Sequence, residues 1–262
     1  MGSASRVALE AATQALASAK GVTLETGEQL LSAGRDIAGS SQLRALLADP
    51  SIETAEKTAL IGKIFSSIDS AATALLGSLV SSRWSNSDQL IDGIEQVGIR
   101  AIADSTESAT IEAELFAFSR AVSSDPDLEL AVGSKLGDPA EKAALVDRLL
   151  AKKVDPGTLA IVRHLVQSPR GRRIGGLLST AAETVADASG GIVATVTAAA
   201  PLTPAQLESL TTTLASQYGR EPRIAVEIDP AVIGGLRVQV GDDVIDGTVA
   251  SRLTELRLQL AG

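Results

Sequence analysis

Apolar residues along most of the chain recur three and four positions apart, which is the spacing of one face of an amphipathic helix. Three such runs lie within residues 43–80, and Asp49-Pro50 after the first run is a helix stop. The pattern therefore predicts three short helices, each with one apolar side buried against its neighbours. The runs are Leu43, Leu46 and Leu47; Leu60, Ile61, Ile64 and Phe65; and Leu75, Leu76, Leu79 and Val80.

The same pattern returns later in the chain, in register. Residues 55–65 align with residues 140–150 at a separation of 85 positions, and five of the eleven pairs are identical. Because a copy of this length is too long for one unit of a solenoid, the repeat predicts two successive helical bundles. Other pairs in the register are Arg35 with Arg120, Ile37 with Val122, Leu43 with Leu128 and, after a one-residue shift, Asp69 with Asp155 and Leu79 with Leu165.

The repeat sets the predicted domain boundaries in the helical part of the chain. We assign residues 1–105 to a first helical bundle and residues 106–188 to a second. Asp138 and Pro139 mark a helix start in the second, because aspartate is a favoured N-cap and proline is tolerated at the first helical position. The polar run 104–112 joins the two copies, either as a separate link or within one continuous helix.

The pattern changes near Ser189-Gly190-Gly191, where Ala-rich helix gives way to a β-branched run typical of a strand. Thr203 and Gln206 then form a capping box, which begins a helix. Residues 189–262 therefore read as an α+β domain with the order strand, helix, three strands and helix. The predicted strands are 192–196, 224–228, 236–240 and the return strand at 244–245, and the last helix has an apolar face of Val249, Leu253, Leu256 and Leu260. The expected fold class is mainly α with a C-terminal α+β domain: two tandem helical bundles followed by a small mixed sheet with helices.

Composition limits the chemistry of this chain. The formal net charge of −9 argues against a sequence-independent grip on nucleic acid, which needs a basic surface. The absence of cysteine excludes disulfides and thiolate metal sites, and a single histidine excludes a His-rich metal site. The longest uncharged stretch, 189–207, contains two prolines, so no membrane span is expected, and residues 1–20 lack the apolar core of a secretory signal.

The C-terminal segment carries a succession of motifs. They are Asp229-Pro230, Ile233-Gly234-Gly235-Leu236, the turn Gly241-Asp242 and Ile245-Asp246-Gly247-Thr248, preceded by the strand-like Val196-Thr197-Ala198-Ala199-Ala200-Pro201-Leu202. In this order the motifs resemble the C-terminal signature of the delta subunit of F-type ATP synthases, the family called the oligomycin-sensitivity-conferring protein in mitochondria.

The resemblance implies a non-catalytic stator subunit of a proton-translocating ATP synthase, without a cofactor. Such a subunit joins the catalytic head to the peripheral stalk at the cytoplasmic face of the cell membrane, without inserting into the membrane. By resemblance, a helical bundle would take the N-terminal segments of the non-catalytic nucleotide-binding subunits, and the C-terminal domain would take the end of the stalk subunit. The family normally has one helical bundle, so the sequence leaves open which of the two copies contacts the head.

A second hypothesis is a small ligand-binding enzyme built on the α+β domain, with a helical regulatory extension. Its support is the Gly234-Gly235 backbone beside a strand, where a ligand could approach closely. The pair is also consistent with a bulge or close backbone packing, and it matches no phosphate-binding motif.

Two single residues attract attention because each is unique in the chain. His164 has no nucleophile or metal ligand beside it in sequence, so we interpret it as an ordinary helix-surface or boundary histidine. Trp84 follows an apolar stripe and is expected to pack in the core, with an anchor at a partner interface as the alternative.

Two polar clusters complete the set of candidates. We interpret the basic cluster as a solvated helix end, with contact to an acidic partner as the alternative. The acidic cluster suits turn and strand-end roles better than a calcium loop, which needs more oxygen ligands in a defined order. No catalytic, cofactor-binding or metal-ligating residue is therefore expected. The basic cluster is Arg163, Arg170, Arg172 and Arg173, and the acidic cluster is Asp242, Asp243 and Asp246.

Overall fold

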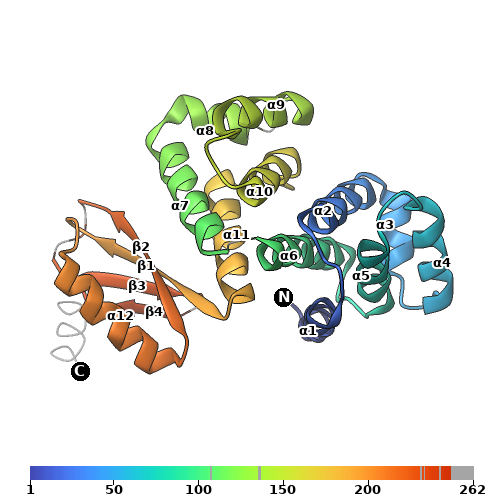
Figure 1. The fold of residues 1–262 in the computed structure, drawn as a ribbon, viewed down its shortest axis with the longest axis horizontal. Coiled ribbons are helices and arrows are strands. Elements are labelled where there is room, and N and C mark those ends of the chain that lie inside the picture. Colours follow the sequence, from blue (N-terminus) through green and yellow to red (C-terminus); the bar gives the residue numbers. More distant parts are fainter. Residues whose placement is uncertain (107, 135–136, 231, 233, 242, 249–262) are drawn as a thin grey trace, which may run out of the picture. The chain divides into compact units, whose positions relative to one another are not determined.

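A computed structural model describes the chain except residues 107, 135–136, 231, 233, 242 and 249–262 (Figure 1). The chain divides into two compact units, Met1–Val185 and Ala186–Gly262. The expected fold class is confirmed, because helices make up the first unit and a four-stranded mixed sheet with a helix lies in the second. In the part of the chain that the structure describes, no helix is both long and apolar enough to cross a membrane.

The regular elements described in the first unit are all helices. The helices of the first copy, residues 1–105, are α1 (Ser3–Ser18), α2 (Leu24–Gly39), α3 (Ser41–Ala48), α4 (Thr54–Ile64), α5 (Ser70–Ser81) and α6 (Ser87–Ser105). Those of the second copy, residues 106–188, are α7 (Ser108–Ser124), α8 (Pro126–Gly133), α9 (Pro139–Leu150), α10 (Pro156–Gln167) and α11 (Ile174–Ala188), the last of which runs past the boundary between the units.

The helix positions follow the register of the repeat. Helices α3 and α4 start 85 residues before α8 and α9, and α5 starts 86 residues before α10, as the one-residue shift predicts. Asp138 accepts a hydrogen bond from the N–H of Ala140 and Pro139 is the first residue of α9, which confirms the predicted helix start. The described residues of 35–80 and 120–166 contain no strand.

Helix α6 holds the two copies together. It packs along α2 in the first copy and also contacts α7 and α10 of the second. The suggestion of one continuous helix through residues 104–112 is wrong, because α6 ends at Ser105 and α7 begins at Ser108. Thr106 between them has an extended backbone, with φ −138° and ψ −175°, which breaks the helical path.

The C-terminal unit is a mixed sheet with α12 packed against it. Its elements are β1 (Gly191–Ala198), α12 (Pro204–Tyr218), β2 (Glu221–Ile228), β3 (Leu236–Val240) and β4 (Asp243–Asp246). The strand order is β2-β1-β3-β4, with β1 and β2 parallel and the other pairs antiparallel. The parallel pair follows from the crossover through α12, which returns the chain to the same end of the sheet.

The local signals of the C-terminal unit appear as predicted. The capping box of Thr203 and Gln206 is present at the start of α12, and Gly219 ends that helix in the left-handed region with φ 66°. The core of the unit gathers side chains from β1, α12 and β3. Its buried members are Ala194, Val196, Leu214 and Val238. The helix predicted from Val249 to Leu260 lies outside the described residues.

Candidate functional site

A buried site of charged side chains is centred on Glu95 of α6. Its carboxylate is only 8% exposed and receives three side chains from the second copy. Nε2 of His164 on α10 lies 3.2 Å from Oε2 of Glu95. Arg170 and Arg172 follow α10, and their Nη2 atoms lie 3.0 and 2.9 Å from the Glu95 carboxylate oxygens. We call Glu95, His164, Arg35, Arg170 and Arg172 the central network.

His164 is 4% exposed, so its interpretation as a surface or boundary histidine is wrong. Nη1 of Arg35 on α2 lies 2.8 Å from Nδ1 of His164. Because a guanidinium only donates hydrogen bonds, Nδ1 accepts, and Nε2 carries the hydrogen that is donated to Glu95. Burial lowers the pKa of His164, and this effect exceeds the opposite influence of the Glu95 hydrogen bond and charge. The imidazole is therefore neutral, with both nitrogens bonded.

Glu95 is held in its ionised form. Burial by itself raises the pKa of this carboxyl, but the hydrogen bond from His164 and the charges of Arg170 and Arg172 outweigh it and lower the pKa to about 2. The network thus places one carboxylate between two guanidiniums and a neutral imidazole. Its chemical effect is to bind helix α6 of the first copy to α10 and the following loop of the second.

The basic cluster divides between this network and the surface. Arg170 also lies 2.8 Å from Asp92, and Arg163 lies 2.6 Å from Asp147 on α9. The solvated-helix interpretation is therefore wrong for Arg170 and Arg172, whose acidic partners belong to the same chain. Arg173 is exposed, as expected. Sequence reasoning missed Glu95 as the acceptor because it lies 75 and 77 residues from the two arginines.

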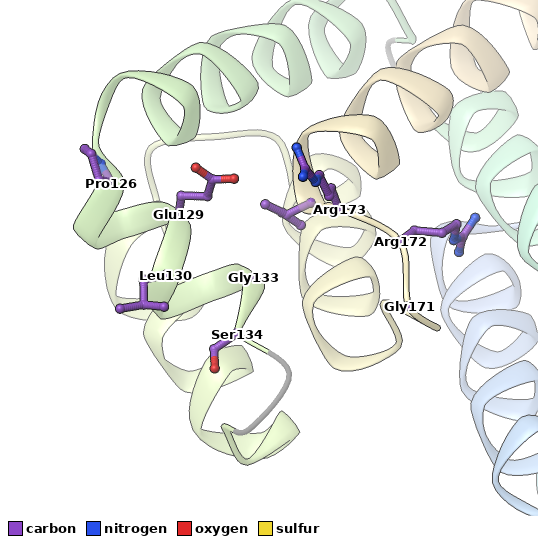
Figure 2. Close-up of a pocket in the computed structure, with 9 residues that line it drawn as sticks. Pro126, Glu129, Leu130, Gly133, Ser134, Gly171, Arg172 and Arg173 are labelled. Carbon is purple, nitrogen blue, oxygen red and sulfur yellow. The ribbon is translucent and has the colours of Figure 1, made fainter.

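A groove of about 540 Å³ lies beside this loop, between α8 and the start of α11. Figure 2 shows Leu130 and Glu129 on its α8 side, with Arg172 turned away from them. That direction follows from the pairing of Arg172 with Glu95. Leu130 is 68% exposed, so it is an apolar surface position of the second copy.

A second site is repeated in the two copies. The backbone N–H of Asp69 donates to Oε1 of Gln29 at 2.8 Å, and that of Asp155 donates to Oε2 of Glu114 at 2.9 Å. Both aspartates cap the helix that follows, and the two acceptors are 85 residues apart. The same hydrogen bond therefore ties α5 to α2 in the first copy and α10 to α7 in the second, which supports a duplication.

Trp84 is a core residue, as expected. It is 5% exposed, and its indole N–H donates to the carbonyl of Leu79 at 2.7 Å. A side chain at Gly93 of α6 would collide with the ring, so the glycine makes room for it. The alternative of an exposed interface anchor does not fit this burial.

The paired glycines before the C-terminal hairpin serve close backbone packing. Gly234 and Gly235 have φ of 66° and 82°, a backbone conformation that residues with a side chain rarely adopt. A Cβ on Gly235 would collide with the carbonyl oxygen of Gly247. The backbone N–H of Gly247 donates a hydrogen bond to the carbonyl oxygen of Leu236 at 2.9 Å. The absence of a side chain at Gly235 therefore allows the backbone before β3 to pack closely against the backbone after β4, and this is a structural reason for the motif.

The acidic cluster takes turn and strand-end positions. Asp246 accepts hydrogen bonds from the N–H and hydroxyl of Thr248 at 3.0 and 2.7 Å, and Asp243 begins β4. Asp242 lies outside the described residues. Within the ranges that are described, no three His, Cys, Asp or Glu side chains are grouped as a metal would require.

Comparisons with known proteins agree with this architecture. The family model of the ATP synthase delta (OSCP) subunit matches residues 99–260. ATP synthase subunit delta of Leifsonia xyli is 48% identical over the whole of both chains, and that of Kineococcus radiotolerans is 39% identical over 91% of this chain and 88% of its own. A solved chain from the Toxoplasma gondii mitochondrial ATP synthase hexamer is 20% identical, covers 63% of this chain and 97% of its own, and has a TM-score of 0.39.

The mainly helical unit followed by a small α+β unit, together with the family match, defines a structural protein of the stator class. The chain belongs to the ATP synthase delta (OSCP) subunit family. It is a non-catalytic subunit of the proton-translocating F-type ATP synthase, linking the catalytic head to the peripheral stalk. This assignment replaces the alternative of a small ligand-binding enzyme.

Proposed function

We propose that the two compact units divide the work of the stator link between them. The helical unit, Met1–Val185, binds the N-terminal segments of the non-catalytic nucleotide-binding subunits on the catalytic head. The C-terminal unit, Ala186–Gly262, binds the end of the peripheral stalk subunit. The chain acts at the cytoplasmic face of the cell membrane, without nucleic acid, metal or cofactor.

The observation that carries this proposal is that each unit has a core of its own. The C-terminal core includes Val196 of β1 and Leu214 of α12, whereas the helical unit buries residues such as Leu30 and Ile94 between α2 and α6. Two separate cores allow two partners to be held without either unit depending on the other for its fold. Helical bundles suit the head side because their surface grooves accept amphipathic helices.

We also propose three functional parts along the chain, residues 1–105, 106–188 and 189–262, of which the second ends with α11, three residues past the boundary between the compact units. The duplicated capping site at Asp69 and Asp155 supports this division. The family model matches residues 99–260, a range that includes the second copy and most of the C-terminal unit but only the last residues of the first copy. The first copy is then free to provide an extra contact with the head.

A pull-down with purified head and stalk subunits tests this division. Removing residues 189–262, which follow the end of α11, should abolish stalk binding and leave head binding, whereas removing residues 1–188 should do the reverse. A specific interface buries roughly 1,200–2,000 Å² in total, which either unit can supply alone. Stalk binding that survives loss of the C-terminal unit would show that the assignment is reversed. Circular dichroism of each truncated chain provides the control for folding.

A further inference from the structure

Helix α10 of the second copy contacts two helices of the first copy, α2 and α6. His164 bonds to both, because Nε2 lies 3.2 Å from Oε2 of Glu95 on α6 and Nδ1 lies 2.8 Å from Nη1 of Arg35 on α2. The imidazole is thus a hydrogen-bonded bridge between three helices. Arg120, which corresponds to Arg35 in the repeat, is exposed, so the buried contact of Arg35 belongs to the junction of the copies and not to the repeated fold.

The hydrogen bond to Arg35 exists only while the imidazole is neutral. A guanidinium donates and never accepts, so it needs the lone pair on Nδ1. An added proton goes to Nδ1, because Nε2 already carries the hydrogen donated to Glu95, and two donors then face each other at 2.8 Å. The bond to Glu95 responds in the opposite way, since a charged donor bonds a carboxylate more strongly than a neutral one. Protonation therefore breaks the contact with α2 and strengthens the contact with α6.

The surroundings of His164 do not compensate for an added positive charge. The residue is 4% exposed, and the hollow beside it, between α2, α6 and α10, has no room for a water molecule. Guanidiniums of Arg35, Arg170 and Arg172 already surround the carboxylate of Glu95 and the imidazole. Nε of Arg170 and Nε of Arg172 are buried donors without an acceptor, so the central network has no spare acceptor for a further proton.

The pKa of His164 agrees with this geometry. Burial, the largest influence, lowers it, and the charges of Arg35 and Arg170 act in the same direction, against the hydrogen bond and charge of Glu95. A proton is therefore bound more readily once the ring is released from Arg35. Other charged groups on the helices around α10 have partners of their own: Asp147 on α9 pairs with Arg163, Glu114 on α7 accepts from Thr158, and Asp92 on α6 pairs with Arg170, while Asp36 on α2 is exposed.

We propose that His164 makes the contact between α2 and α10 a pH-sensitive joint between the two helical copies. A proton on Nδ1 displaces Arg35, whose side chain is half-buried and can turn into water. Helix α10 then separates from α2, while its bond to Glu95 keeps it on α6. The joint is closed in neutral solution and opens as the pH falls below 6.5, the ordinary pKa of an imidazole. The inference holds whichever partner each copy binds.

The test measures the distance between two spin labels on the full chain, between about pH 8 and about pH 5. The chain contains no cysteine, so Glu28→Cys on α2 and Ala144→Cys on α9, which packs along α10, can carry the labels at exposed positions. The population with the longer distance should rise by up to about tenfold for each pH unit below 6.5, the effect of one proton bound by the open state alone. NMR of His164 records its titration in the same samples, and circular dichroism records the helix content.

Arg35→Gln is the decisive variant. It removes the charge that faces the protonated ring, and its amide can either donate or accept, so the label distance should lose most of its pH dependence. His164→Gln does not titrate and should have the same effect. Arg120→Gln makes the matched change at the exposed position of the second copy and should behave as the wild type does. Labels at Glu10→Cys and Glu28→Cys, both in the first copy, should keep their distance at each pH.

The other outcomes contradict the joint. If His164 takes up a proton and the distance between α2 and α9 stays the same, the joint does not exist. If Arg35→Gln opens as the wild type does, another group drives the opening and the proposal is wrong. It is also wrong if the helix content or the distance within the first copy changes before His164 titrates, because the chain then unfolds instead of opening at this contact.

Discussion

Nε2 of His164 on α10 donates a hydrogen bond to Oε2 of Glu95 on α6, across 3.2 Å and 69 residues of sequence. This bond joins the second helical copy to the helix that closes the first. Arg170 and Arg172 converge on the same carboxylate, so the junction is an ion cluster rather than a purely apolar contact. A stator link transmits force between its two ends, and a fixed junction between the copies suits that task.

Replacing Glu95 by alanine should lower the free energy of unfolding of the helical unit. The change leaves two guanidiniums without their shared carboxylate. We expect a loss of about 3 kcal/mol, at the low end for a broken buried pair, because the side chain of Arg172 is still 36% exposed. Urea unfolding of the full chain measures it.

A surface ion pair provides the control for this substitution. Asp88→Asn breaks the pair with Arg44, but the Asp88 side chain is 76% exposed, so the expected loss is below about 1 kcal/mol. Equal losses for Glu95→Ala and Asp88→Asn would contradict a central role for the network.

Acidification should destabilise the chain in two ranges of pH. The pKa of His164 is below 6.5 in the folded state, so the unfolded chain binds a proton first and stability falls as the pH drops below 6.5. The pKa of Glu95 is about 2 instead of 4.5, so its stabilising contribution is present above pH 4.5 and is lost as the pH falls toward 2. Thermal midpoints measured across this range follow both losses.

His164→Gln separates the first range from the second. Glutamine can accept from Arg35 and donate to Glu95, but it does not titrate, so the decrease just below pH 6.5 should become smaller. Since His164 is the only histidine, its NMR signal reports the titration directly. A histidine pKa at or above 6.5 would rule out the neutral, buried imidazole.

The repeated capping site predicts a specific loss in the second copy. Glu114 accepts hydrogen bonds from the N–H of Asp155 and the hydroxyl of Thr158, at 2.9 and 2.5 Å. Glu114→Ala leaves both donors without this acceptor and should cost about 1–3 kcal/mol in unfolding free energy. Glu114→Gln keeps an acceptor, as Gln29 does in the first copy, and should cost less. Similar losses for the two variants would mean that the hydrogen bonds contribute little.

Gly235→Val should destabilise the C-terminal unit by more than about 1 kcal/mol, since the substitution meets both a positive φ and a backbone collision. Gly241→Ala is the control for the backbone collision, because Gly241 also has a positive φ, 57°, but has open space where a Cβ would lie. The two variants are compared in the full chain by the hydrogen-exchange rates of the strand amides. Unchanged exchange in Gly235→Val would show that the close approach to Gly247 is dispensable.

The sequence predicted elements whose determinants are local. The helical run from Leu75 to Val80, the cap at Asp138 and the box at Thr203 each depend on residues within a turn or two, and each appears as expected. Close backbone packing at Gly235 was one of the alternatives that paired glycines beside a strand allow, along with a bulge or a ligand contact.

The central network could not be predicted in the same way. Whether His164 is buried depends on Glu95 and Arg35, which lie 69 and 129 residues away, and no local pattern indicates them. The parallel pairing of β1 with β2 is similar, since alternation marks a strand without choosing its neighbour. Such features are decided by which helices and strands pack together.

The central claim, that this chain links the head mechanically to the stalk, is tested most directly by reconstituting proton pumping. Membranes stripped of both the catalytic head and this chain receive the head alone, or the head together with the purified chain. The account predicts that the added head hydrolyses ATP in both cases, but that ATP drives proton uptake only when the chain is present. Full proton uptake with the head alone would contradict it.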